Sequence, residues 1–168
     1  GSFLMVYGYL LVTWFAGLNP ASYYDVDAPV NWLHVLAQFV VVDFFIYWAH
    51  VFEHKFVTYY KKSHKNHHEF RQPKLYNAFN GSVLDTMTLI LIPLFITLQL
   101  CRFVSTASFI AFGTLYATQF TLIHSEYEHV WERLFRPLGI GTAWDHQVHH
   151  ALFIYNYGHF FMWWDRIF

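Results

Sequence analysis

The segment His64-Lys65-Asn66-His67-His68 has an HxxHH spacing that returns at His146-Gln147-Val148-His149-His150. On an α-helix, residues three and four apart lie on the same face, so we expect each segment to present three imidazoles to one point. A third pair, His50 and His54, has the i, i+4 spacing that lets two side chains bind one ion. These three clusters of histidines predict a metal site.

The donor set indicates which metals would bind and how many. Imidazole suits iron, copper, nickel and zinc, and the three clusters contain no cysteine thiolate that would favour zinc. A structural zinc ion takes four ligands, which is fewer than the histidines available here. The surplus of ligands therefore predicts two ions.

The composition is typical of a membrane protein. Of the 168 residues, 56% are hydrophobic and only 12% are charged, whereas about a quarter of the residues of a typical soluble domain are charged. The net charge is −1 with neutral histidines, so we expect no nucleic-acid partner. The single cysteine, Cys101, excludes an internal disulfide.

The length of the chain predicts one domain that covers residues 1–168. The chain begins with Gly1-Ser2, without an initiator methionine, and ends directly after Phe168. We therefore expect this domain to be trimmed at both ends.

Apolar segments predict an all-α integral membrane bundle of about three to four transmembrane helices. Residues 30–49 are apolar over roughly the 20 positions that cross a bilayer. Residues 83–101 and 103–123 are two further apolar segments, joined so tightly that we expect a hairpin. The shorter apolar run 3–18 is interpreted as the tail of a first transmembrane helix.

This topology places every histidine from His50 onward on one face of the membrane, because the hairpin crosses the bilayer and returns the chain to the same side. His34 alone lies elsewhere. All Lys and Arg side chains except Arg102 share the histidine face. The positive-inside rule makes that face cytoplasmic, or the equivalent side of an organelle.

With these clusters and this topology, the chain resembles the fatty acid hydroxylase/sterol desaturase superfamily of membrane di-iron enzymes from about Val30 to Phe168. The resemblance rests on HxxxH at His50, the two HxxHH segments and an isolated histidine at His124. The tail His149-His150-Ala151-Leu152-Phe153-Ile154-Tyr155-Asn156-Tyr157-Gly158, followed by Trp164-Asp165-Arg166, is most similar to the sterol C5-desaturase branch.

The resemblance implies transmembrane helices under a cytosolic helical cap, in the endoplasmic reticulum or another organelle membrane. It also implies two iron ions, which zinc can replace, molecular oxygen as co-substrate, and electrons from cytochrome b5 or a similar donor. Some hydroxylase branches have a second histidine near His129, which joins the same ion as His124 only if the helix breaks. The implied ligands are His50, His54, His64, His67, His68, His124, His146, His149 and His150, with His129 as a further candidate.

Acidic residues near the ligands are candidates to hold the outer ring nitrogen of a histidine. Asp85 is our first choice because acids inside a membrane are costly and tend to be functional, and Asp145 is the second. For each acid alone, a solvated or helix-capping role is equally compatible. Asp43 is interpreted as a structural hydrogen-bonding partner. His159 is compatible with ligand, substrate-pocket and packing roles.

The expected function is O2-dependent desaturation or hydroxylation of a membrane lipid, either a sterol or a fatty acyl chain, with sterol C5 desaturation as the nearest named reaction. The alternative is a structural or accessory subunit that works with other membrane subunits and carries a retained or vestigial metal site. A zinc-dependent hydrolase is a weaker third hypothesis, because it would leave many histidines unused.

Overall fold

The computed structural model describes residues 2–168, and every regular element in this range is helical. One isolated antiparallel bridge, between Ile140 and Phe161, is added to the helices. The longer elements are α1 (Ser2–Phe15), α2 (Trp32–Lys55), α5 (Ile92–Leu100), α6 (Thr106–Leu122) and α8 (Ala143–Leu152). The shorter ones are η1 (Ala21–Tyr24), α3 (Val57–Lys62), η2 (His67–Glu69), η3 (Leu75–Phe79), α4 (Val83–Thr86), the π-helical turn η4 (Met87–Leu91), α7 (Glu132–Phe135), η5 (Arg136–Leu138) and α9 (Trp163–Ile167).

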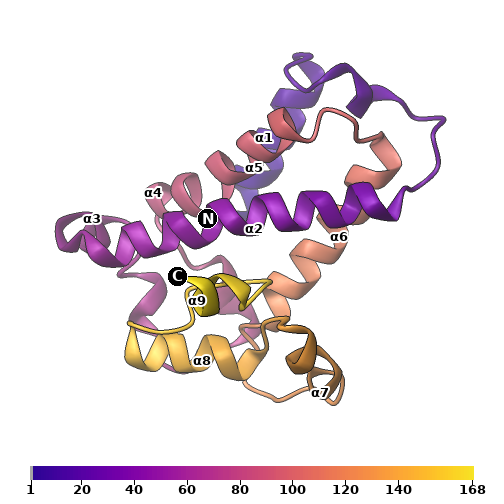
Figure 1. Cartoon of the computed structure of the whole chain (residues 1–168). Helices are drawn as coiled ribbons and strands as arrows, with labels where there is room; N and C mark the ends of the chain where they lie inside the picture. Colours follow the sequence, from indigo (N-terminus) through magenta and orange to yellow (C-terminus); the bar gives the residue numbers. More distant parts are fainter. Residues whose placement is uncertain (1) are drawn as a thin grey trace.

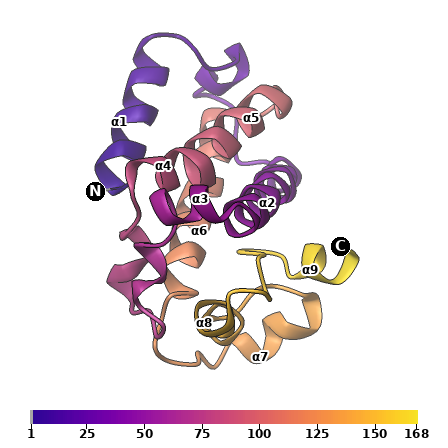
Figure 2. The ribbon, with the colours of Figure 1, turned by 90° about the vertical axis from the view of Figure 1, so that its left-hand side faces the viewer.

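Helix α2 is the central element of the fold. It crosses the middle of the molecule, with α4 and α5 on one side and α8 and α9 on the other (Figures 1 and 2). Asn31 begins the helix, because its side chain accepts hydrogen bonds from the amides of Leu33 and His34. Its C-terminal end extends past the predicted boundary at residue 49 and so carries both His50 and His54.

An apolar core joins α2 to the two helices that pack on it, α5 and α6. Phe39, Val42 and Ile46 lie buried on α2 and belong to one cluster with Leu98 and Phe112 from the neighbouring helices. Burial of such side chains removes apolar surface from water and drives this packing. The core therefore holds the end of α2 that carries the histidines.

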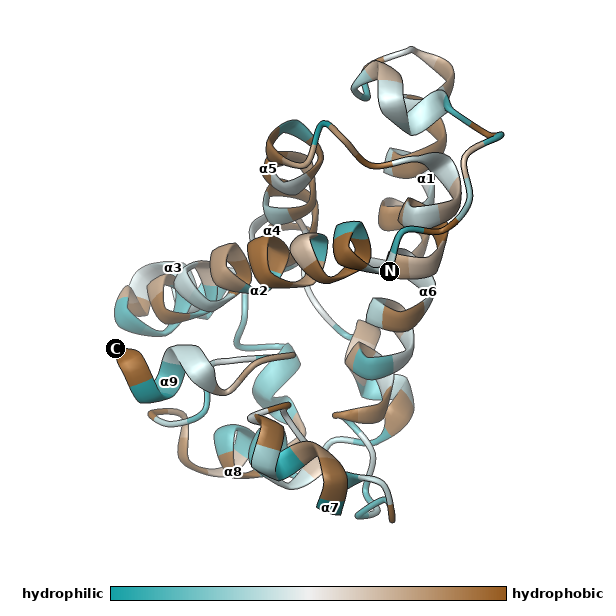
Figure 3. Cartoon of the chain, turned by 45° about the vertical axis from the view of Figure 1, so that its right-hand side comes forward, coloured by the Kyte–Doolittle hydropathy of each residue, from teal (hydrophilic) through white to brown (hydrophobic). Residues whose placement is uncertain are grey.

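Two segments are long and apolar enough to cross a membrane, α2 and the α4–α5 unit Val83–Leu100. Large apolar side chains such as Leu33 (75% exposed) and Ile110 (61% exposed) point outward from this part of the molecule, and the hydropathy colouring of α1, α2 and α5 is largely brown (Figure 3). The predicted count of three to four spans is not established, because α1 has 14 residues and α6 has 17, short of the roughly 20 needed.

The second candidate span contains a π-helical turn immediately before Pro93. The amide of Ile92 bonds the carbonyl of Met87, five residues back, instead of the usual four. Proline has no amide hydrogen, and local π geometry is one way in which a helix accommodates it. Leu89 and Ile90 of this turn line a small cleft together with His64 and His67.

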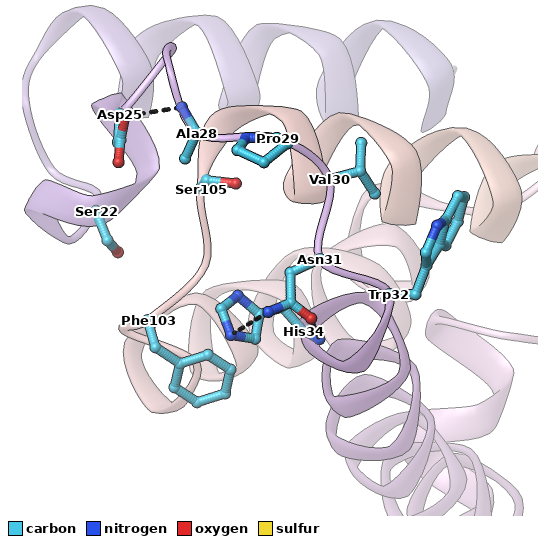
Figure 4. Close-up of a pocket in the computed structure, with 10 residues that line it drawn as sticks. All are labelled: Ser22, Asp25, Ala28, Pro29, Val30, Asn31, Trp32, His34, Phe103 and Ser105. Atoms are coloured by element: carbon cyan, nitrogen blue, oxygen red, sulfur yellow. Dashed lines mark hydrogen bonds between the residues drawn. The ribbon is translucent and has the colours of Figure 1, made fainter.

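The end of the bundle far from His50 is closed by the loop between α1 and α2. Ser22 donates a hydrogen bond to the carbonyl of Arg102, and the amide of Asn31 donates to Ser108 Oγ at 2.9 Å. A shallow pocket of about 450 Å³ lies in this loop (Figure 4), where His34 pairs with Asn31. This pocket is separate from the histidine clusters.

Candidate metal centre

Nine histidines from four parts of the chain meet in two adjacent groups. Within each group, one ring nitrogen from every member lies within 4.8 Å of those of the others. The C-terminal end of α2, the turn and 3-10 helix η2 after α3, the turn after α6 and helix α8 each contribute side chains. The first group is His50, His54, His64, His68 and His149, and the second group is His67, His124, His146 and His150.

Each HxxHH segment is divided between the two groups, so the expectation that its three imidazoles meet at one point is wrong. On α8, His146 and His150 are four apart and share a face, whereas His149 lies about 100° from His150 and turns to the first group. The other segment is not α-helical, because it is a turn followed by the 3-10 helix η2. There His64 and His68 join the first group and His67 joins the second.

Backbone carbonyls fix the tautomer of several of these rings. The Nδ1 atom of His50 lies 2.8 Å from the carbonyl oxygen of Tyr157, and the corresponding distance for His124 and Phe120 is 2.7 Å. A carbonyl oxygen only accepts hydrogen bonds, so Nδ1 carries the proton in each ring. The rings of His149 and His150 are held in the same way, by the carbonyls of Tyr155 and Phe70. The Nε2 lone pair of each ring is therefore free to bind a metal.

The donor set fits a metal ion. His50 Nε2 and His64 Nε2 lie 3.0 Å apart, although the Nδ1 atom of each ring already donates to an oxygen, the Tyr157 carbonyl and the Asp85 carboxylate respectively. Two nitrogen lone pairs at this distance repel each other and cannot form a hydrogen bond, whereas a cation bound by both would stabilise them. The histidine groups thus have the chemistry of a metal site.

Two carboxylates contact the outer nitrogen of His64. Asp85 Oδ1 lies 2.6 Å from His64 Nδ1, and Glu53 Oε2 lies 3.3 Å from the same atom. Both acids are buried. A carboxylate in this position orients the ring and increases the basicity of the opposite nitrogen. Asp85 is the acid expected from the sequence, and Glu53, which is adjacent to His54 in the chain, is a second acid at the same ring.

Asp145 has a different role, because it forms the start of α8. Its carboxylate accepts hydrogen bonds from the amide and the hydroxyl of Thr142, at 3.1 and 2.7 Å, while Thr142 Oγ1 accepts from the Asp145 amide. This reciprocal arrangement is a capping box. Asp145 therefore fixes where the helix of His146 begins, and within residues 2–168 its carboxylate accepts hydrogen bonds from Thr142, not from a histidine.

His129 belongs to neither histidine group. The helix does break after Leu122, as a ligand at this position would require, but the ring of His129 stacks on Trp131 with 4.6 Å between centroids. The turn between α6 and α7 directs this side chain to its local neighbour. The structure therefore brings together nine of the ten predicted ligands.

Burial keeps the clustered imidazoles neutral. Desolvation, followed by the repulsion of neighbouring imidazoles, lowers the pKa of His67 and His146 well below its ordinary value. The same causes lower the pKa of His68 to about 2, and desolvation lowers that of His150 to about 4. A neutral imidazole is the form that binds metal, so these residues are ready to ligate at physiological pH.

A segment after α8, residues 155–161, covers the centre, and we refer to it as the strap. Its carbonyls at Tyr155 and Tyr157 hold His149 and His50. Asp43 of α2 accepts hydrogen bonds from the amides of Phe160 and Phe161, both at 2.8 Å, and from the indole of Trp164. Asp43 is thus a structural partner, as predicted, and it anchors the strap.

Two separate spaces lie between the helical bundle and the histidines, an apolar cavity of about 260 Å³ and a cleft of about 10 Å³. The cavity lies between α1, α2, α5 and α6, with side chains such as Tyr7, Leu94 and Phe112 in its wall. The cleft is lined by His64, His67 and His159. Ile90 of the π-helical turn lines both spaces. An apolar molecule in the cavity would therefore contact Ile90, the side chain that also lines the cleft with His64 and His67.

Comparison with known proteins gives consistent relatives. The chain is 45% identical over 98% of its length to an alternative squalene epoxidase of Phaeodactylum tricornutum, covering 48% of that protein. It is 27% identical over 92% of its length to a Delta(7)-sterol-C5(6)-desaturase of Nicotiana tabacum, covering 60%, and 31% identical over 84% to a lathosterol oxidase of Rattus norvegicus, covering 47%. The chain spans about half the length of these curated relatives. No solved structure matches it.

The sequence model of the fatty acid hydroxylase family matches residues 35–168. This range begins in α2, contains all nine clustered histidines and ends with α9. The relatives include sterol desaturases and methylsterol monooxygenases, which agrees with the predicted sterol desaturase branch of oxidoreductases. The chain belongs to the fatty acid hydroxylase family.

Proposed function

We propose that this protein is an O2-dependent oxidoreductase that uses two iron ions to oxidise a triterpenoid lipid, either squalene or a sterol. The observation that carries the proposal is the pair of neutral histidine groups, which lie next to each other near a cavity lined almost wholly by apolar side chains. Imidazole-rich sites suit iron, and zinc can replace it by affinity. A lipid is the class of substrate that an apolar cavity inside candidate membrane spans would accept.

Each histidine group would hold one ion. The first group offers five nitrogens and the second offers four. When bound, the iron pair would supply the activation of O2 that an unactivated C–H bond or an alkene requires. The protein contributes the rest: Asp85 and the backbone carbonyls orient the rings, and burial of the ligands excludes bulk water.

Epoxidation of squalene is the first candidate reaction, because the 45% identity to an alternative squalene epoxidase extends over 98% of the chain. In that reaction an alkene, O2, two electrons and two protons give an epoxide and water. The second candidate is desaturation at C5 of a sterol, favoured by the 27–32% identity to several sterol desaturases. There a CH–CH unit, O2, two electrons and two protons give an alkene and two water molecules.

Both reactions consume two electrons, for which we propose a cytochrome b5-like donor on the histidine side. The side chains of Lys55, Lys61, Lys62 and Lys65 are exposed near the end of α2, and positive charge there suits an acidic protein or an anionic lipid surface. The same charges support a cytoplasmic orientation of the histidine face, in the endoplasmic reticulum or another organelle.

The proposal can be tested by lipid analysis in a yeast strain that lacks its own squalene epoxidase, with the protein expressed under ¹⁸O2. We expect 2,3-oxidosqualene that carries one ¹⁸O atom. A His67→Ala, His149→Ala double variant removes one ligand from each group and should abolish this product. Metal analysis of the purified protein should give about two irons per chain, lost in the variant.

Other outcomes have definite meanings. In the same cells supplied with lathosterol, a new sterol double bond without ¹⁸O would replace epoxidation by C5 desaturation. Normal expression with neither product and no bound metal would overturn the enzymatic proposal. Fixed stoichiometry with other membrane subunits in that case would favour an accessory role with a vestigial metal site.

A further inference from the structure

His159 is a buried histidine in the centre whose ring has no hydrogen-bonding partner. It is only 5% exposed, and neither Nδ1 nor Nε2 contacts a donor or an acceptor within the described residues. Leaving both polar atoms of a buried ring unpaired is costly. A group in this state either receives a partner from a bound molecule or weakens the fold.

The ring lies where the two histidine groups and the cleft meet. Its centroid is 5.0 Å from that of His50 in the first group and 5.4 Å from that of His146 in the second. It lines the cleft that shares Ile90 with the apolar cavity. His159 does not belong to either set of mutually close ligand nitrogens.

The backbone on both sides of His159 is held in place. The amides of Phe160 and Phe161 donate to Asp43, and the amide of Gly158 donates to Asp165 Oδ2 at 2.8 Å. The backbone of the strap packs directly against Gly141, because a Cβ atom at this glycine would lie 2.7 Å from the carbonyl oxygen of His159. The ring therefore has a fixed position at the cleft, as a group that orients a ligand requires.

We propose that His159 is a lipid-positioning residue, which donates a hydrogen bond to an oxygen atom of a substrate or product lipid that reaches the cleft from the apolar cavity. The inference rests on the proposed lipid-oxidising function. A neutral imidazole has one N–H donor, and the oxygen would be the hydroxyl of a sterol or the epoxide oxygen of the squalene product. The cavity wall is largely apolar, and its polar side-chain groups are the hydroxyls of Tyr7 and Tyr116.

The proposal is distinct from a tenth metal ligand, and a binding experiment separates the two. The protein is purified in mild detergent with its metal and kept without reductant, so that no turnover occurs. Retention of tritiated lipids is then measured for two matched pairs, squalene against 2,3-oxidosqualene and lathosterol against its 3-deoxy analogue. Each pair differs by one oxygen atom, and comparing the pairs tells whether a hydroxyl or an epoxide is bound.

We expect the oxygen-bearing member of one pair to bind about tenfold more tightly than its partner, the effect of one buried hydrogen bond. His159→Phe should abolish this preference with its metal content unchanged, and His159→Gln, which keeps an N–H donor, should restore part of it. His129→Phe is the matched control, because that ring lies outside both groups, and it should behave as the parent protein.

Three results would overturn the proposal. Loss of metal in His159→Phe would make His159 a ligand. Binding without an oxygen preference in the parent, or a preference that survives in His159→Phe, would reject the positioning role while the lipid-oxidising function stands. Failure of the folded, metal-loaded parent to bind either pair would reject the proposed function as well.

Discussion

At the scale of single residues, the centre depends on groups that touch the ligands from outside. His64 is one of these ligands, and two acidic side chains, Asp85 and Glu53, approach its Nδ1 atom. Only one proton is available on that nitrogen, so it is Asp85, at 2.6 Å, that forms the stronger hydrogen bond. The buried acids thereby fix the ring whose Nε2 faces His50.

Substituting Asp85→Asn should weaken metal binding without removing it. The amide oxygen can still accept from His64, but the negative charge that increases ligand basicity is lost. We expect the metal affinity to fall by about 10–100-fold, measured by competition with a chelator of known affinity. Asp27→Asn, in an exposed loop at the other end of the molecule, is the control, and equal affinities for the two variants would contradict the role of Asp85.

Gly81 is a second residue on which the position of Asp85 depends. A Cβ atom there would lie 2.0 Å from Asp85 Oδ2, so Gly81→Ala should displace the carboxylate and reduce metal affinity to a similar extent. Gly8→Ala, with no atom within 4 Å of the new methyl group, is the matched control. It should bind metal normally and gain up to about 1 kcal/mol of stability in helix α1. Unchanged chelator competition in Gly81→Ala would refute the prediction.

At the scale of elements, the strap joins the metal centre to the helical bundle. Its carbonyls hold His50 and His149, and Asp43 of α2 binds its far end. An acid at 0% exposure inside a candidate membrane span is explained by the three N–H donors that it satisfies. Folding of the strap and assembly of the centre are therefore coupled.

Replacing Asp43 by Asn should disturb the strap. The asparagine has one acceptor oxygen, so at least one buried N–H of Phe160, Phe161 or Trp164 loses its partner. We expect a loss of about 1–3 kcal/mol in stability together with reduced metal content, measured by thermal unfolding and elemental analysis. Asp25→Asn in the distant loop is the control. A variant that is as stable and as rich in metal as the parent would show that the strap does not depend on Asp43.

At the scale of the whole molecule, a large group of imidazoles is buried in one place, and this makes stability depend on pH. In the unfolded chain these histidines have a pKa near 6.5, whereas burial lowers the pKa of His150 to about 4 in the folded protein. Between these values the unfolded state binds more protons than the folded state, so the free energy of unfolding decreases as the pH falls.

The metal-free protein should accordingly lose stability when the pH is lowered from about 6.5 toward 4, and should show little change from these groups above pH 7. Urea unfolding in detergent at several pH values measures this. Bound metal should increase stability at neutral pH and be released on acidification, because protons compete for the same nitrogens. Stability that rises as the pH falls through this range would contradict the prediction.

The sequence alone determined the kinds of ligand, the helical class and the main apolar segments. Residues 30–49 and 83–101 were recognised because helix formation and membrane insertion depend on local composition. The i, i+4 pairs were also local, so the shared face of His146 and His150 was predictable. The same spacing could not show that His149 would turn to a different group.

Only the tertiary structure decided how these residues combine. His149 meets His68, 81 positions away, and Asp43 meets Phe161, 118 positions away, so their pairing depends on how α8 and the strap dock against α2. The burial of Glu53 and the unpaired ring of His159 arise from the same docking. Local periodicity specifies the face of a helix, but the partner of that face is set by packing between distant segments.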